Sequence, residues 1–108
     1  MYPTELKQGD TFRRKLSLTD KDTGEPVDLS DCTAYCQLRR SPGQELLLTA
    51  SATIDGGTIY VTLTKDQTAG LEPGEYGFDV RLEYEDDRRT LYTEWINVIL
   101  PFTEREDA

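Results

Sequence analysis

The stretch from Thr58 to Tyr84 constrains the fold of this chain more than any other. In its first part apolar and polar residues alternate, so that Ile59, Val61 and Leu63 fall on one face. In its last part five apolar or aromatic residues share a face: Tyr76, Phe78, Val80, Leu82 and Tyr84. Alternation with a period of two is typical of half-buried β-strands. We therefore predict two strands here, joined by a short connection.

That connection contains the signals for a helix start and a tight turn. Thr64 and Gln67 have the spacing of a capping box, in which each side chain bonds the backbone N–H of the other residue. Gly70 and Pro73 limit the helix to about one turn, near residues 65–70. A Pro-Gly pair then suits the central positions of a type II turn.

Turn-rich segments divide the rest of the chain into short strands. The expected strands cover residues 12–18, 32–40, 45–50, 52–54 and 89–100, after a polar lead-in over residues 1–10. Arg14 occupies an otherwise inward position of the first of them, which indicates an edge strand or a face near the rim of the sheet. This spacing predicts an all-β fold, an immunoglobulin-like antiparallel β-sandwich of about seven strands. With 108 residues, we expect one domain over residues 1–103 and a solvated tail over residues 104–108.

A tyrosine corner would strengthen the immunoglobulin-like interpretation. In such sandwiches a Tyr near the start of the penultimate strand donates a hydrogen bond to the backbone a few residues upstream. Leu71, Gly74 and Tyr76 have the matching order just before the longest predicted strand. The alternative is that Tyr76 is an ordinary core aromatic; we favour the corner because Gly74 and the position in the strand agree with it.

The net charge argues against two classes of binding partner, and the cysteine spacing indicates the redox compartment. The formal net charge of -9 argues against nucleic acid and anionic membranes as partners. The chain has no secretory signal pattern and no apolar run long enough to cross a membrane. Cys32 and Cys36, if on one strand, are about 13 Å apart. A disulfide needs less than about 7 Å, so we expect free thiols and a reducing cytoplasm.

Residue chemistry gives no support for catalysis, a metal or a cofactor. The chain contains no His, which excludes Ser-His-Asp and Cys-His machinery, and it has no Gly-rich phosphate loop. Asp79 and Glu83 share a strand face, but a solvated sheet face explains them without catalysis. Asp20, Asp22 and Asp28 could supply oxygen ligands to calcium, although their spacing departs from the EF-hand pattern and we favour a solvated turn. We therefore expect a non-enzyme without a cofactor.

Four aromatic residues are the candidate interface: Tyr35, Tyr60, Tyr92 and Trp95. Tyr35 and Tyr60 fall on the polar parity of their predicted strands, where an aromatic ring marks a protein or sugar contact. The simpler interpretation is that each ring covers a neighbouring strand as a cross-strand pair.

Read from end to end, the chain resembles small bacteriophage tail and baseplate-region proteins with immunoglobulin-like domains, most closely the N-terminal domain type that anchors fibres to a baseplate. The residues that carry the resemblance are Gly9–Phe12, Asp22–Leu29, Thr33–Arg39, Ile59–Thr64, Gln67–Ala69 and Leu71–Val80. The resemblance implies a non-enzymatic structural or adaptor protein of a phage or prophage particle. Its partners would be other phage structural proteins or further copies of itself. It would assemble in the host bacterial cytoplasm and then reside in the virion.

The alternative function is a carbohydrate-binding or adhesion module. It requires Tyr35, Tyr60 or Trp95 to lie exposed and coplanar on one face of the sandwich, because sugars stack on exposed aromatic rings.

Overall fold

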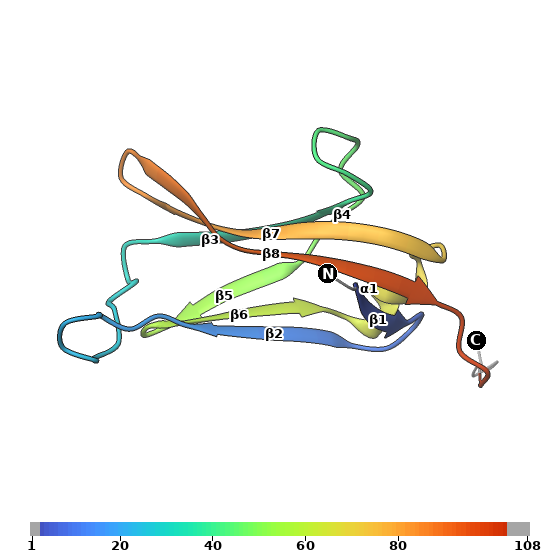
Figure 1. Ribbon diagram of the computed structural model, residues 1–108, viewed down its shortest axis with the longest axis horizontal. Coiled ribbons are helices and arrows are strands. Elements are labelled where there is room, and N and C mark those ends of the chain that lie inside the picture. Colours follow the sequence, from blue (N-terminus) through green and yellow to red (C-terminus); the bar gives the residue numbers. More distant parts are fainter. Residues whose placement is uncertain (1–2, 104–108) are drawn as a thin grey trace.

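Alternation along the strands gives each sheet one apolar face, and two such faces pack together in this protein (Figure 1). The computed structural model describes residues 3–103, so the predicted tail over residues 104–108 lies outside the described residues. The elements in chain order are β1 (Thr4–Lys7), β2 (Phe12–Ser17), β3 (Thr33–Arg39), β4 (Leu48–Thr49), β5 (Ser51–Asp55), β6 (Thr58–Leu63), α1 (Lys65–Ala69), β7 (Gly74–Tyr84) and β8 (Asp87–Ile99).

The strand order is that of an immunoglobulin-like sandwich. The larger sheet has the order β1-β8-β7-β3-β4 and the smaller one β2-β6-β5. Neighbouring strands are antiparallel except for β1, which pairs in parallel with β8. The predicted all-β sandwich is confirmed, with eight strands in residues 3–103 where about seven were expected. Arg14 lies on β2, an edge strand of the smaller sheet, as its position in the sequence indicated.

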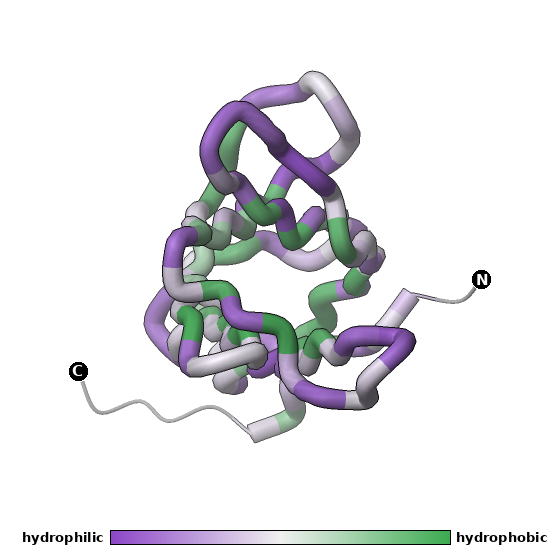
Figure 2. The backbone as a smooth tube through the Cα atoms, turned by 90° about the vertical axis from the view of Figure 1, so that its left-hand side faces the viewer, coloured by the Kyte–Doolittle hydropathy of each residue, from purple (hydrophilic) through white to green (hydrophobic). Residues whose placement is uncertain are grey.

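The core lies between the sheets and is built from the predicted alternating residues. Ile59, Val80 and Ile96 are completely buried, and Phe78 packs edge-on against Phe12 with ring centroids 5.7 Å apart. Figure 2 shows hydrophobic colour around the interior and hydrophilic colour over the projecting loops. The free energy of burial is therefore concentrated on β6, β7 and β8, the strands that the alternation identified.

Strand β1 corrects the expectation of a polar lead-in over residues 1–10. Its four residues pair with Ile96–Ile99 of β8, and Leu6 is buried in the core. One apolar residue on so short a strand gives no periodicity. The hydrogen bonds of β1 are made with the far end of the chain, which local sequence does not reveal.

The strand expected at residues 45–50 is also wrong in extent. Only Leu48 and Thr49 pair with β3, while Leu46 and Leu47 are exposed. A turn at residues 41–44, closed by the Gln44 amide donating to the Ser41 carbonyl at 3.1 Å, carries the following residues off the sheet edge. The pairing with β3 therefore includes Leu48 and leaves out Leu46.

The helix and its cap agree with the sequence. The Gln67 amide donates to the Thr64 hydroxyl at 3.1 Å, and the Gln67 side-chain oxygen accepts from the Thr64 amide at 2.9 Å. The helix has five residues, and within residues 3–103 no helix has the length and apolar character needed to span a membrane. The buried Thr68 hydroxyl donates to the Asp10 carbonyl at 2.7 Å, which fastens α1 to the turn between β1 and β2.

Tyr76 makes the hydrogen bond of a tyrosine corner. Its hydroxyl donates to the Glu72 carbonyl, four residues upstream, at 2.6 Å, and burial raises the pKa of the phenol. Leu71 is buried beside this turn, and Gly74 has φ +136°, a backbone conformation that favours glycine. The Arg40 guanidinium lies 4.1 Å from the centre of the Tyr76 ring and covers it.

Replacing Tyr76 by phenylalanine should lower the free energy of unfolding by about 1 kcal/mol, because one intramolecular hydrogen bond is lost while the ring keeps its packing. Urea denaturation measures this change. Tyr60→Phe is the matched control, since the Tyr60 hydroxyl makes no hydrogen bond to any of residues 3–103. Equal stability of Tyr76→Phe and the native protein would show that the corner hydrogen bond does not stabilise the fold.

Candidate functional site

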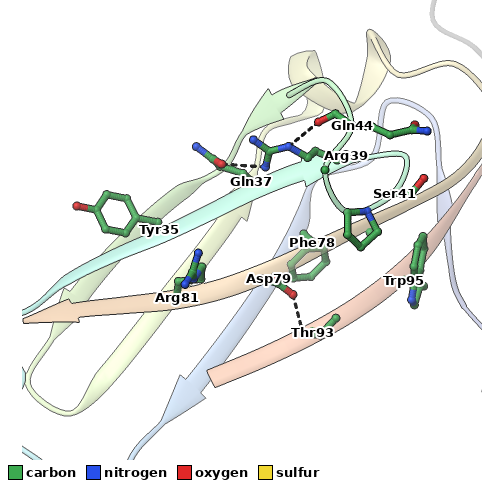
Figure 3. Close-up of a pocket in the computed structure, with 13 residues that line it drawn as sticks. Tyr35, Gln37, Arg39, Ser41, Gln44, Phe78, Asp79, Arg81, Thr93 and Trp95 are labelled. Atoms are coloured by element: carbon green, nitrogen blue, oxygen red, sulfur yellow. Dashed lines mark hydrogen bonds between the residues drawn. The ribbon is translucent and has the colours of Figure 1, made fainter. Parts of the chain in front are cut away.

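The outer face of the larger sheet contains a groove of about 450 Å³ (Figure 3). Strands β3, β7 and β8 form its floor, because residues of one parity on all three strands point away from the core. The turn at residues 41–44 borders it. We call this site the outer groove; its outward side chains are Tyr35, Gln37, Arg39, Asp79, Arg81, Thr93 and Trp95.

Strand register fixes where each side chain lies in the outer groove. Arg39, Gly77 and Trp95 are directly opposite one another on β3, β7 and β8. Gly77 leaves space that the indole of Trp95 enters, since a Cβ at Gly77 would lie 3.2 Å from two of its ring carbons. Tyr35 lies opposite Arg81, at the other end of the groove. Both rings are exposed, Tyr35 by 42% and Trp95 by 38% of their surface.

The floor between the two rings is polar and partly hydrogen-bonded. The Thr93 hydroxyl donates to the Asp79 carboxylate at 2.7 Å. Arg39 donates to the Gln37 side chain and to the Gln44 carbonyl, both at 2.9 Å, so its guanidinium is held in place. Arg81 makes no hydrogen bond or ion pair with any of residues 3–103. Two guanidinium groups and one carboxylate therefore line a groove on a chain of net charge -9.

The four aromatic residues of the predicted interface are divided between three places. Tyr35 and Trp95 share the outer groove. Tyr60 lies on the outer face of the smaller sheet, where it is 39% exposed and the Lys15 ammonium is 5.9 Å from its ring centre. Tyr92 is half-buried and packs against Phe78. The structure therefore joins Tyr35 and Trp95 and separates them from Tyr60 and Tyr92.

The carboxylates and thiols considered for chemistry have other partners or are shielded. Hydrogen bonds from Arg88, at 2.6 and 2.8 Å, hold the pKa of Glu83 below its ordinary value. A general acid needs the opposite shift. Cys32 and Cys36 are both free thiols. Burial, with the nearby Asp79 charge, raises the pKa of Cys36 to about 12, so this thiol stays protonated and weakly nucleophilic.

The aspartates considered for calcium organise turns. The Asp20 carboxylate accepts hydrogen bonds from the amides of Asp22 and Thr23 at 2.8 and 3.3 Å. Asp28 accepts from the Ser30 amide at 3.0 Å, which lowers the pKa of Asp28. Within residues 3–103, no three acidic, His or Cys side chains gather closely enough to hold a metal ion.

A buried charged cluster, absent from the sequence interpretation, joins the two sheets beside β1. Glu94 is 7% exposed and accepts hydrogen bonds from the Arg14 Nε and Nη2 atoms at 2.8 and 2.6 Å. The hydroxyls of Thr4 and Tyr92 donate to the same carboxylate, each at 2.7 Å. Burial alone would raise the pKa of Glu94, but these hydrogen bonds outweigh it and the pKa is lowered. This cluster is structural, because its polar atoms are satisfied by one another.

Two features were not predicted from the sequence, although it contains a signal for each of them. They are the buried charged cluster and the polar floor of the outer groove. Arg14 and Glu94 have opposite charge and both fall on the inward parity of their strands, which indicates a buried pair. The polar floor of the outer groove could be found by taking the residues with the parity of Tyr35 and Trp95 on their strands. The distances across β3, β7 and β8 depend on register, which the sequence alone does not give.

Comparison with known families identifies a β-sandwich class. A family described as LtfC-like, beta-sandwich domain has a model that matches residues 4–97. The match fits a phage-associated β-sandwich domain. No curated protein matches the chain.

Proposed function

The chain belongs to the LtfC-like β-sandwich domain family, and from this premise we propose that it is a non-enzymatic structural or adaptor protein of a phage or prophage particle. It acts in tail or baseplate assembly through protein–protein contacts made by the outer groove. Assembly takes place in the host bacterial cytoplasm before the protein enters the virion. The free thiols of Cys32 and Cys36 support a reducing compartment.

The observation that carries this proposal is the composition of the outer groove. Tyr, Trp and Arg are the residue types most enriched at the energetic centres of protein interfaces. Here Tyr35 and Trp95 are exposed on one sheet face. Arg81 lies opposite Tyr35, and Arg39 lies in the same cross-strand row as Trp95. Large aromatic rings exposed together in this way favour a contact surface over a purely solvated face.

Carbohydrate binding is the second candidate, supported by a narrower observation. Tyr35 and Trp95 lie on the same face, with the side chains of Gln37, Asp79 and Thr93 between them as hydrogen-bonding groups. Tyr60, the third aromatic residue considered for sugar binding, does not share this face, because it lies on the smaller sheet. Saturable binding on a glycan array, lost in Trp95→Ser, would favour this candidate.

Affinity capture with matched variants tests the proposed function. The tagged protein is expressed in the source bacterium with its resident phage induced, and captured proteins are quantified by mass spectrometry. We expect tail or baseplate proteins to be recovered with the native protein and with Tyr60→Ser. Trp95→Ser should recover about 30-fold less, the effect of losing one strong interface residue. Tyr60 is the matched control, because its exposed fraction is 39% and that of Trp95 is 38%.

Two outcomes would overturn the proposal in different ways. Equal recovery with Trp95→Ser and the native protein would show that the contact surface lies elsewhere on the molecule. Recovery of no particle protein with any form, together with saturable glycan binding, would replace the structural function with the sugar-binding one.

A further inference from the structure

Two large apolar residues follow β8 without any cover from the described chain. Leu100 is 58% exposed and Phe102 is fully exposed. The sequence continues as Glu104, Arg105, Glu106 and Asp107, with three acidic residues to one basic residue. Residues 100–107 thus combine an aromatic residue with an acidic stretch; we call them the C-terminal segment.

The outer groove complements the C-terminal segment in length. Tyr35 and Trp95 are four residues apart along the strands and two strand spacings apart across them. These offsets correspond to about 13 Å and about 10 Å, or about 16 Å on the diagonal. An extended chain from residue 102 to residue 107 covers about 17 Å. An aromatic residue at one end of the groove would therefore place the acidic residues along its polar floor.

The outer groove also complements the C-terminal segment in charge. Its floor carries Arg39 and Arg81 against Asp79, whose carboxylate already accepts the Thr93 hydroxyl. The Arg81 side chain makes no hydrogen bond or ion pair within residues 3–103, although its charge helps to lower the pKa of the nearby Glu83, and it can bind a carboxylate in bidentate geometry. An acidic segment thus meets a positive excess on an otherwise acidic protein.

We propose that the outer groove of one copy binds the C-terminal segment of a second copy. The aromatic ring of Phe102 packs beside Trp95, and the acidic residues pair with Arg81 and Arg39. The donor is a second copy because the chain after β8 leaves the sandwich on the side away from the turn at residues 41–44 (Figure 1). The inference rests on the proposed function in one respect, that the groove is a protein-contact surface.

This contact joins two different surfaces, so it can repeat from copy to copy. A contact of this kind generates a closed ring when the rotation between copies closes, and a filament when it does not. A copy with a damaged groove can still donate its segment, and a copy with a damaged segment can still receive one. That asymmetry provides the test.

Tryptophan fluorescence reports groove occupancy directly, because Trp95 is the only tryptophan in the chain. The probe is a synthetic peptide of residues 100–107, acetylated and amidated so that its ends carry no charge. It is titrated into a chain shortened to end at Ile99, which retains every described strand. We expect a saturable change in Trp95 emission, weakened about 30-fold by Arg81→Glu or by Phe102→Ser in the peptide. Absence of a saturable change would overturn the proposal.

Mixing full-length variants distinguishes a second copy from the chain's own segment. Arg81→Glu and Phe102→Ser should each be monomeric by light scattering at concentrations where the native chain associates. Mixed together they should form a one-to-one dimer that does not grow further. One outcome would overturn the proposal. If the native chain stays monomeric, and removal of its C-terminal segment changes Trp95 emission at every protein concentration, the segment docks within its own chain.

Failure here is separable from failure of the proposed function. In one outcome the peptide does not bind, while Trp95→Ser still recovers less particle protein than the native chain in the capture experiment. In that case the proposed function is retained and only the contact between two copies is rejected. If the peptide binds and no particle protein is captured, self-association stands and the proposed function falls.

Discussion

Replacing Arg14 by methionine should lower the free energy of unfolding by about 3 kcal/mol at pH 7, because Glu94 would remain buried without its partner. The Arg14 side chain is 31% exposed, which places the expected value at the low end of the range for a broken buried ion pair. Urea denaturation at neutral pH measures the loss.

The control for Arg14→Met is Arg13→Met, which removes the same charge from the exposed face of the same strand. We expect it to change stability by less than about 0.5 kcal/mol. The double variant Arg14→Met/Glu94→Met should recover part of the loss, since a packed apolar pair often replaces a buried ion pair without penalty, while the Thr4 and Tyr92 hydroxyls lose their acceptor. A single variant as stable as the native protein would show that Glu94 is reached by water.

The pH dependence follows from the lowered pKa of Glu94. A carboxyl whose pKa is lower in the folded than in the unfolded chain contributes stability above its ordinary value of 4.5, and the contribution is lost as the pH falls through the folded pKa. In Arg14→Met the burial remains and the strongest donor is gone, so the pKa of Glu94 should rise above 4.5. The difference between native protein and variant should therefore be largest at neutral pH and shrink by about pH 4.

Replacing Phe78 by alanine should lower the free energy of unfolding by about 3–5 kcal/mol. Phe78 is 3% exposed, and its ring contacts Phe12 edge-on and lies 6.2 Å from the ring of Tyr92. Truncation removes both aromatic contacts and leaves a cavity between the two sheets. Thermal or urea unfolding gives the value.

Tyr35→Ala provides the comparison on the opposite face of the larger sheet. It also deletes an aromatic ring, but that ring is 42% exposed, so the expected loss is below about 1 kcal/mol. Similar losses for Phe78→Ala and Tyr35→Ala would contradict the assignment of Phe78 to the core. The comparison also separates folding from function, because Tyr35→Ala changes the outer groove while the core is preserved.

Local sequence was sufficient wherever periodicity or a cap decided the structure. The alternation from Tyr76 to Tyr84 identified β7, and Thr64 with Gln67 identified the start of α1. Tyr76 was correctly associated with a hydrogen bond to an upstream carbonyl because the turn that presents it is also local.

Sequence was insufficient where the partner lies far along the chain. Strand β1 depends on β8 for its hydrogen bonds, and Arg14 depends on a carboxylate eighty residues away. The grouping of Tyr35 with Trp95 follows from the order β8-β7-β3 and its register. Leu46 shows the reverse case, in which a local pattern favoured a strand over residues 45–50 but the paired strand begins only at Leu48.

The parallel pairing of β1 with β8 has a consequence for folding during synthesis. The ribosome makes β1 before β8, and the paired Thr4 and Ile96 are ninety-two positions apart in the sequence. At ordinary elongation rates this interval lasts about 5–20 s. Thr4 and Leu6 therefore have no partner strand until β8 has been made, and the long loop that separates β1 from β8 closes late. The larger sheet can therefore be completed only after β8 has been synthesised, and this edge of β8 has no partner strand until β1 pairs with it.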